Sequence, residues 1–300
     1  MNKKGIGLII MTAIISGVSI YLNKSGVSFF DPVVFTFMKN VLAALILSLI
    51  VLSWKNISAI SRLNFRSWIT LVIIGLIGGS LPFILFFKGL AATSALQGSF
   101  IHKTMFIYVS ALAVIFLKEK INKYFFGGAI LVLIGNLIVI RGLSLAPNWG
   151  DFLILSATLL WALENIISKH AMKKIHCDTI AWARMFFGAI FILAYLWING
   201  QSDLATSLNL KQIGWVMLAS VLLSGYVITW YRGLAKIPVS VASSVLILGS
   251  PVTTMLVILS SGKINWGEIL SAFFIVSGVI VIIIFGYAGI KKQEKEAVRT

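Results

Sequence analysis

The chain has few charged residues and particularly few acidic ones. Only 11% of its 300 residues are charged, with 25 Lys and Arg against 9 Asp and Glu. Soluble globular domains carry about 25% charged residues. Here 59% of the residues are hydrophobic and the mean hydropathy is +1.00. These values exclude a soluble domain and predict an integral membrane protein.

Cysteine and catalytic motifs are also scarce. Cys177 is the single cysteine, which excludes an internal disulfide and a thiolate metal cluster. The sequence has no HExxH, Walker A or GxSxG motif. The tightest group of potential ligands is one short turn with His170, His176, Cys177 and Asp178. Without a second cluster we expect only adventitious metal binding there. We therefore predict no enzyme, no metal site and no cofactor.

Long apolar runs fill most of the chain. A helix needs about 20 apolar residues to cross a hydrocarbon core of about 30 Å. Ten segments are long enough, and we expect helices at 5–22, 33–53, 67–87, 92–116, 122–140, 151–169, 179–198, 212–231, 237–260 and 266–288. The first lacks an Ala-x-Ala cleavage pattern and nine more follow, so we expect a retained helix. The fold class predicted is an all-α integral membrane protein.

The net charge of +16 is explained by topology. If the N-terminus is cytoplasmic, 17 of the 25 basic residues lie on the cytoplasmic side. The outer side then has only five, which are Lys24, Lys88, Arg141, Lys211 and Lys263. By the positive-inside rule both termini are predicted to be cytoplasmic. The basic excess also attracts anionic lipids, and we expect no nucleic acid partner.

The layout of one stretch returns later in the sequence. Lys88-Gly89-Leu90-Ala91 reappears 144 residues on as Arg232-Gly233-Leu234-Ala235. Lys120-Ile121-Asn122 reappears 143 residues on as Lys263-Ile264-Asn265, so a single-residue gap aligns the two copies. Unrelated membrane helices match by chance at some positions, but two matches in register favour an internal repeat.

The repeat divides the chain into two halves of five helices. Lys24 aligns with Lys169, and Lys39 with Arg184. We expect a first repeat at 1–145, a second at 146–290 and a basic cytoplasmic tail at 291–300. Because five is odd, the second half enters the membrane from the opposite side, which gives two inverted five-helix repeats. Inverted repeats are typical of secondary transporters.

With its repeated Gly-Leu-Ala motif, long helix, basic turn and Gly-containing helix, the chain resembles the EamA-type members of the drug/metabolite transporter superfamily. The resemblance implies a central cavity lined mainly by helices 1, 3, 4, 6, 8 and 9, with helices 5 and 10 peripheral. It also implies a small-molecule cargo, such as amino acids, other metabolites, nucleotide sugars or sugar phosphates. Helix 4 departs from the family pattern: it has His102-Lys103 and lacks a central proline such as Pro251 of helix 9, which disfavours a neutral substrate.

Ionisable side chains inside a bilayer favour a functional interpretation. Lys103 shares a helical face with Ser99 and Ser110, and it either binds an anionic group or forms a structural ion pair. For the neighbouring His102 we favour a packed, hydrogen-bonded side chain.

Helix 6 has one polar face, formed by Trp161, Glu164, Asn165 and Ser168. Glu164 either holds a substrate ammonium or a coupled proton, or forms a salt bridge to Lys103 or Arg184. The matched Lys39 and Arg184 are candidate gates, although long basic side chains near helix ends usually extend to the interface.

Two prolines indicate interrupted helices near a cavity. Pro82 leaves the carbonyl of Gly78 without a helical donor, and Pro251 does the same for Ile247, close to Ser250. The same features also suit close helix packing, as in the Gly75-xxx-Gly79 pair.

These observations predict a secondary active transporter of the plasma membrane that exports or exchanges a small polar metabolite, such as an amino acid, by alternating access. The predicted substrate-binding residues are Lys103, Glu164, Asn165, Trp161, Ser99 and Ser250, and the predicted gating or coupling residues are Lys39, Arg184 and Glu164. One alternative is an exchanger of organic anions or phosphorylated metabolites. Another is a proton-coupled exporter of cationic amines, and a third is a scaffold without transport. The functional unit is a monomer or a homodimer.

Overall fold

The computed structural model describes residues 2–29, 31–51, 60–140, 148–201, 209–262 and 264–287, and all regular structure in these ranges is helical. Nine helices there are long and apolar enough to cross a membrane, and Lys123–Ile138 is a shorter apolar helix. These correspond to the ten predicted spans and confirm the fold class. Lys263 and the tail at 291–300 lie outside the described residues, and the repeat boundaries stay predictions.

The first five spans are α1 (Lys3–Gly26), α2 (Pro32–Val51), α4 with η1 and α5 (Phe65–Ile74, Gly75–Ser80, Leu81–Ala92), α6 with α7 (Ala95–Lys103, Met105–Leu117) and α8 (Lys123–Ile140). The second five are α9 (Trp149–Ala171), α10 (Cys177–Ile198), α11 (Leu210–Leu234), α12 with α13 (Val239–Leu246, Gly249–Ser261) and α14 with η3 (Trp266–Val281, Ile282–Gly286).

The predicted span at 92–116 corresponds to the membrane span Ala95–Leu117, which is interrupted at Thr104 between α6 and α7. At the break, Thr104 N donates to Ile101 O at 3.1 Å and Ile107 N donates to Thr104 O at 3.0 Å. These bonds span three residues instead of four, which tightens the backbone and separates α6 from α7. The ninth span breaks at the matching position between α12 and α13. The break therefore recurs in both repeats although only the ninth span has a proline.

The third span changes its winding before Pro82. Residues Gly75–Ser80 form a π-helix between α4 and α5. This segment lies directly on α10: a Cβ added to Gly79 would stand 1.8 Å from the carbonyl oxygen of Arg184. The predicted close contact at the small-residue pair is confirmed, and it brings the backbone of the third span next to Arg184.

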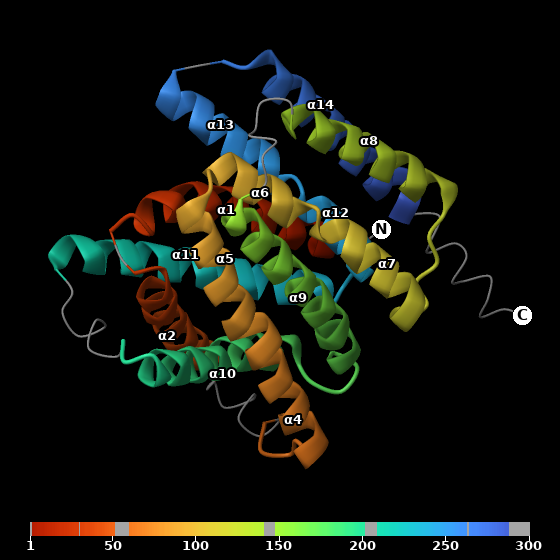
Figure 1. Ribbon diagram of the computed structural model, residues 1–300. Helices are drawn as coiled ribbons and strands as arrows, with labels where there is room; N and C mark the ends of the chain where they lie inside the picture. The colour runs from red at the N-terminus through yellow and green to blue at the C-terminus, as the bar shows by residue number, and fades with distance from the viewer. Residues whose placement is uncertain are drawn as a thin grey trace, which may run out of the picture.

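The fifth and tenth spans lie at the edge of the bundle. Figure 1 shows α8 and α14 side by side and away from the centre. Gly128 of α8 and Gly278 of α14 face each other, because a Cβ on either would stand 2.6 Å from the carbonyl oxygen of the other. The peripheral position expected for these two helices is confirmed. The centre of the bundle is therefore formed by the other eight spans.

Candidate functional site

A cavity of about 80 Å³ lies among the central helices. At about 10–15 Å³ for each water molecule, it has room for roughly five to eight waters, or for a small metabolite. Its polar lining comes from α1, α2, α6, α9, α10 and α11 and consists of Ser16, Ser19, Asn23, Lys39, His102, Glu164, Asn165, Arg184 and Tyr226. Its aromatic lining consists of Phe83, Phe86, Phe87, Trp161 and Trp230.

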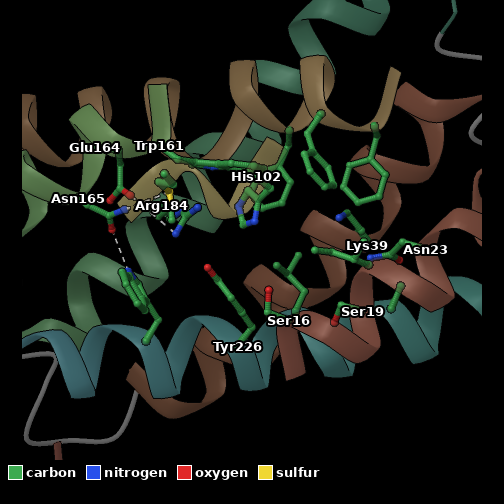
Figure 2. A pocket seen from close by; sticks show the side chains of 18 residues that line it. Ser16, Ser19, Asn23, Lys39, His102, Trp161, Glu164, Asn165, Arg184 and Tyr226 are labelled. Carbon is green, nitrogen blue, oxygen red and sulfur yellow. Dashed lines mark hydrogen bonds and ion pairs between the residues drawn. The ribbon is translucent and has the colours of Figure 1, made fainter. Parts of the chain in front are cut away.

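The cavity differs from the expected lining at three helices. The second and seventh spans contribute Lys39 and Arg184, which the resemblance did not imply. No described residue of α12 or α13 lines the cavity, so the expectation for the ninth span is wrong in this conformation. Figure 2 shows Lys39 and Asn23 at one end and Glu164 and Asn165 at the other, with Arg184 and His102 between them.

Glu164 is the acidic side chain among the described lining residues of the cavity, and it is completely buried. Its Oε1 accepts hydrogen bonds from Ser168 Oγ and, at 2.5 Å, from the hydroxyl of Tyr231. Its Oε2 has no hydrogen-bond partner in the described part of the chain. Arg184 Nη1 lies 3.9 Å from Oε2, so the ion pair is loose. Glu164 therefore has one satisfied oxygen and one that can accept a donor from the cavity.

The carbonyl of Gly78 positions two of the cavity side chains. It accepts a hydrogen bond from Trp161 Nε1 at 2.9 Å and another from Arg184 Nε at 3.1 Å. Pro82 has no N–H with which to close the helical bond to this carbonyl, which leaves it available. The sequence-based prediction that Pro82 frees Gly78 is confirmed. The break in the third span thus orients the guanidinium beside Glu164.

The second proline has a different effect from the one predicted. The carbonyl of Ile247 accepts a hydrogen bond from Ser250 N at 2.8 Å, so it is not free. The chain turns more tightly between α12 and α13 and satisfies that carbonyl locally. Pro251 therefore contributes to packing at the break and not to the cavity lining.

Asn165 continues the polar face of α9 as predicted. Its Oδ1 accepts a hydrogen bond from Trp230 Nε1 at 2.9 Å, and its Nδ2 lies 3.8 Å from the sulfur of Met105. Trp161, Glu164 and Asn165 all line the cavity. One face of a single helix therefore supplies three of the six predicted substrate-binding residues.

The other three predicted residues lie outside the cavity lining. Lys103 is 2% exposed, and its Nζ donates to Ser16 Oγ at 2.7 Å. Ser16 lines the cavity, and Lys103 lies behind it. The hydroxyl of Ser99 is buried without a hydrogen-bond partner in the described chain. Ser250 is buried in α13. Lys103 forms no ion pair with Glu164 within the described residues, since the partner of Glu164 is Arg184.

The sequence analysis predicted that Lys103 faces the cavity, but the neighbouring His102 faces it instead. Its ring stands edge-on to that of Trp161, with centroids 5.2 Å apart. Its Nδ1 is buried and has no hydrogen-bond partner among the described residues, in contrast to the expected hydrogen-bonded histidine. Two adjacent residues point about 100° apart on a helix, and packing decides which one faces the cavity.

The two ends of the cavity differ in access. Ser19 and Asn23 are partly exposed at one end, whereas Glu164 and Asn165 are buried at the other. Glu119 joins the turn after α7 to the start of α12, because its carboxylate accepts from Val239 N at 2.7 Å and from Ser240 N at 3.1 Å. The carboxylate stabilises the N-terminus of α12. The cavity lining is therefore less buried toward the end of α1 than it is at Glu164.

The suspected metal ligands have structural partners. His176, Cys177 and Asp178 place their ligand atoms within 4.8 Å of one another. Both oxygens of Asp178 accept from Arg232, at 2.8 and 2.9 Å, and His176 Nδ1 accepts from Asp178 N at 3.3 Å. This cluster begins α10 and ties it to the end of α11.

Repeated apolar helices around a buried polar cavity define a multi-pass helical membrane protein. A model of the EamA-like transporter family matches residues 3–141 and again 148–284. The chain belongs to this family and is a membrane transporter. This result favours transport over the scaffold and enzyme alternatives.

Individual relatives agree with the family assignment. The chain is 26% identical over 278 residues to the uncharacterized transporter YyaM of Bacillus subtilis, covering 89% of this chain and 90% of YyaM. It is 28% identical over 257 residues to the uncharacterized transporter YoaV of the same organism, covering 82% of this chain and 84% of YoaV. A solved crystal structure shares the fold with a TM-score of 0.75 at 14% identity, covering 93% of this chain and 96% of that one.

Proposed function

We propose that the protein is a secondary active transporter that exports or exchanges a small zwitterionic metabolite, such as an amino acid, by alternating access. One observation carries the proposal. Glu164 and Arg184 face each other across 3.9 Å inside the cavity, and Glu164 Oε2 has no hydrogen-bond partner in the described chain. A loose pair of opposite charges is a suitable site for a ligand that carries both charges on adjacent atoms.

In this account the substrate ammonium donates to Glu164 Oε2 and the substrate carboxylate accepts from Arg184. The planar guanidinium suits a carboxylate, and Gly78 already fixes its orientation. Each new bond is charge-assisted in a buried site, which makes it stronger than a bond in water. The rings of Phe86 and Trp161 line the adjoining wall and suit an apolar side chain. The carboxylate role that the sequence suggested for Lys103 is reassigned to Arg184.

The charge distribution supports a plasma-membrane location with both termini in the cytoplasm, by the positive-inside rule. With that orientation the end of α1, where Asn23 is partly exposed, is external, which favours access to the cavity from that face. Glu164 also offers a site for a coupled proton.

A second candidate is exchange of organic anions or phosphorylated metabolites. It is favoured by the charge balance of the cavity, which has two cations, Lys39 and Arg184, against the single carboxylate of Glu164 among the described lining residues. The same excess disfavours export of cationic amines, because a cationic substrate would be repelled twice.

Counterflow in proteoliposomes tests the proposal. Vesicles with purified protein are loaded with one unlabelled compound, and uptake of the labelled compound is followed for amino acids, organic acids, sugar phosphates and alkylamines. Amino acids should exchange. Glu164→Gln and Arg184→Gln should each reduce the exchange about tenfold or more, since each loses a charge-assisted bond of about 1.5–3 kcal/mol.

The matched control is Glu268→Gln, which neutralises a carboxylate on the peripheral α14. It should exchange amino acids at the wild-type rate. Amino acid exchange that persists in both Glu164→Gln and Arg184→Gln would refute the proposed site. Exchange of sugar phosphates without amino acids would favour the second candidate.

A further inference from the structure

Lys39 lies at the cavity end near Asn23 (Figure 2), and three phenyl rings surround its ammonium. Its Nζ lies 3.5 Å from the ring centroid of Phe87, 4.7 Å from that of Phe83 and 5.9 Å from that of Phe35. Lys39 is 2% exposed. Phe35 and Lys39 are four residues apart on α2, as are Phe83 and Phe87 on α5, so each helix presents its pair on one face.

No carboxylate neutralises this lysine in the described part of the chain. Lys39 has neither an ion pair nor a hydrogen bond to a side chain or carbonyl there. The negative faces of the aromatic rings take the place of a counter-ion. Phe35 and Phe87 stand edge to face with centroids 5.7 Å apart, so the rings also hold one another. Lys39 is in effect a cation tethered inside an aromatic cage.

Such cages recognise free alkylammonium ions in the same way. Phe83 and Phe87 line the cavity together with Lys39, so a substrate in the cavity can reach the rings. Lys39 prevents this in two ways. It occupies the cage, and together with Arg184 it repels a second cation.

We propose that Phe35, Phe83 and Phe87 form an ammonium-binding cage, and that Lys39 fills this cage and thereby restricts the transporter to substrates that carry a carboxylate. The inference rests on the proposed function, because it names the residue that selects the substrate by charge. Without the Lys39 ammonium, the empty cage and the carboxylate of Glu164 make the same cavity a site for small alkylammonium ions. Lys39 is therefore a specificity-determining residue.

A purely structural lysine makes a different prediction. If Lys39 only fills space between α2 and α5, then a small residue in its place should leave a gap that shows no preference for an ammonium ion over a neutral molecule of the same size. A selective role of Lys39 therefore predicts that its removal creates a new binding site for an ammonium ion, whereas a purely structural role predicts no such site.

Equilibrium binding of radiolabelled tetramethylammonium to the purified full-length protein in detergent tests the inference. The wild type should show no saturable binding. Lys39→Ala and Lys39→Ser, whose short side chains leave the cage empty, should both bind the ion, with affinity at least about tenfold above any wild-type signal. Adding Phe87→Leu to Lys39→Ala should weaken the binding at least about fivefold, because the nearest ring is lost. Tertiary butanol, a neutral molecule of similar size, should not compete.

The matched control is Lys88→Ala, which removes a lysine of α5 whose Nζ donates to Tyr195 outside the cavity lining. It should gain no binding. The inference is overturned if Lys39→Ala or Lys39→Ser elutes as a folded, monodisperse species and does not bind tetramethylammonium. It is also overturned if Phe87→Leu leaves the new binding unchanged. Because this assay measures no transport, its failure is distinct from a failure of amino acid counterflow in the wild type.

Discussion

Lys24 and Lys169 bind the carbonyls at the ends of two equivalent helices, α5 and α11, on opposite faces of the membrane. Lys24 Nζ, at the end of α1, donates to the carbonyls of Leu90 and Ala91 at 3.0 and 3.3 Å. Lys169 Nζ, at the end of α9, donates to those of Leu234 and Ile237 at 2.5 and 2.8 Å. Leu90 and Leu234 belong to the repeated Gly-Leu-Ala motif. The two halves therefore share this lysine-to-carbonyl contact as well as the order of their helices.

Loss of either lysine should loosen its own face of the bundle. Lys24→Met and Lys169→Met should each destabilise the protein by about 1–2 kcal/mol, since an ammonium bonded to helix-end carbonyls is lost. Thermal unfolding in detergent measures the effect as a lower apparent melting temperature. Lys123→Met, at an exposed position on α8, is the control. Equal melting temperatures for all three variants would contradict the capping role.

Pro82 should matter for transport and Pro251 should not. In Pro82→Ala the new N–H can bond to the carbonyl of Gly78 and compete with Trp161 and Arg184 for it. A shift of Arg184 by about 1 Å should reduce counterflow about tenfold or more. In Pro251→Ala the relevant carbonyl already has a backbone donor, so counterflow should stay near the wild-type rate. Similar rates in the two variants would show that Gly78 does not position the site.

Lys103→Met should be tolerated although the residue lies deep in the membrane. Burying a lysine at mid-membrane costs about 2.5–3.5 kcal/mol, and Lys103 has one hydroxyl partner and no ion pair within the described residues. The apparent melting temperature should stay the same or rise. Because Lys103 does not line the cavity, the substrate Kd should change less than about threefold, or about 0.7 kcal/mol. A tenfold loss of affinity would restore Lys103 to the substrate site.

The ion pair between Asp178 and Arg232 should protect the single cysteine. Cys177 is half-buried, and its Sγ lies 3.8 Å from Asp178 Oδ1. Breaking a partly exposed pair costs about 1 kcal/mol, so Arg232→Gln should speed maleimide labelling of Cys177 about fivefold through local opening. Arg66→Gln, at an exposed position on α4, should leave the labelling rate unchanged. An unchanged labelling rate in Arg232→Gln would show that the ion pair does not hold the N-terminal end of α10.

The helix positions and the repeat could be predicted from sequence because both depend on local composition and spacing. The predicted spans agree with the helices to within five residues at each end. The polar face of α9 and the free carbonyl of Gly78 were also predictable, since helical periodicity and proline chemistry act over one or two turns.

The remaining features depend on long-range packing. Lys103 and His102 are adjacent, and the contact of α6 with Ser16 of α1 and with Gly249 of α13 decides which of them faces the cavity. Lys39 was expected to extend to the interface, but two rings from α5 hold it inside. The register of α2 against α5 is set by tertiary structure, and no local pattern encodes it.

The most direct test is a thermal stability series with one amino acid, such as leucine, and two analogues that each lack one charge. At 100 times its Kd a ligand stabilises by about 2.7 kcal/mol. Leucine should raise the apparent melting temperature, whereas its methyl ester and its deaminated acid should not. Glu164→Gln and Arg184→Gln should both abolish the leucine effect. Stabilisation by the deaminated acid that equals that by leucine and persists in Glu164→Gln would contradict a zwitterion site between Glu164 and Arg184.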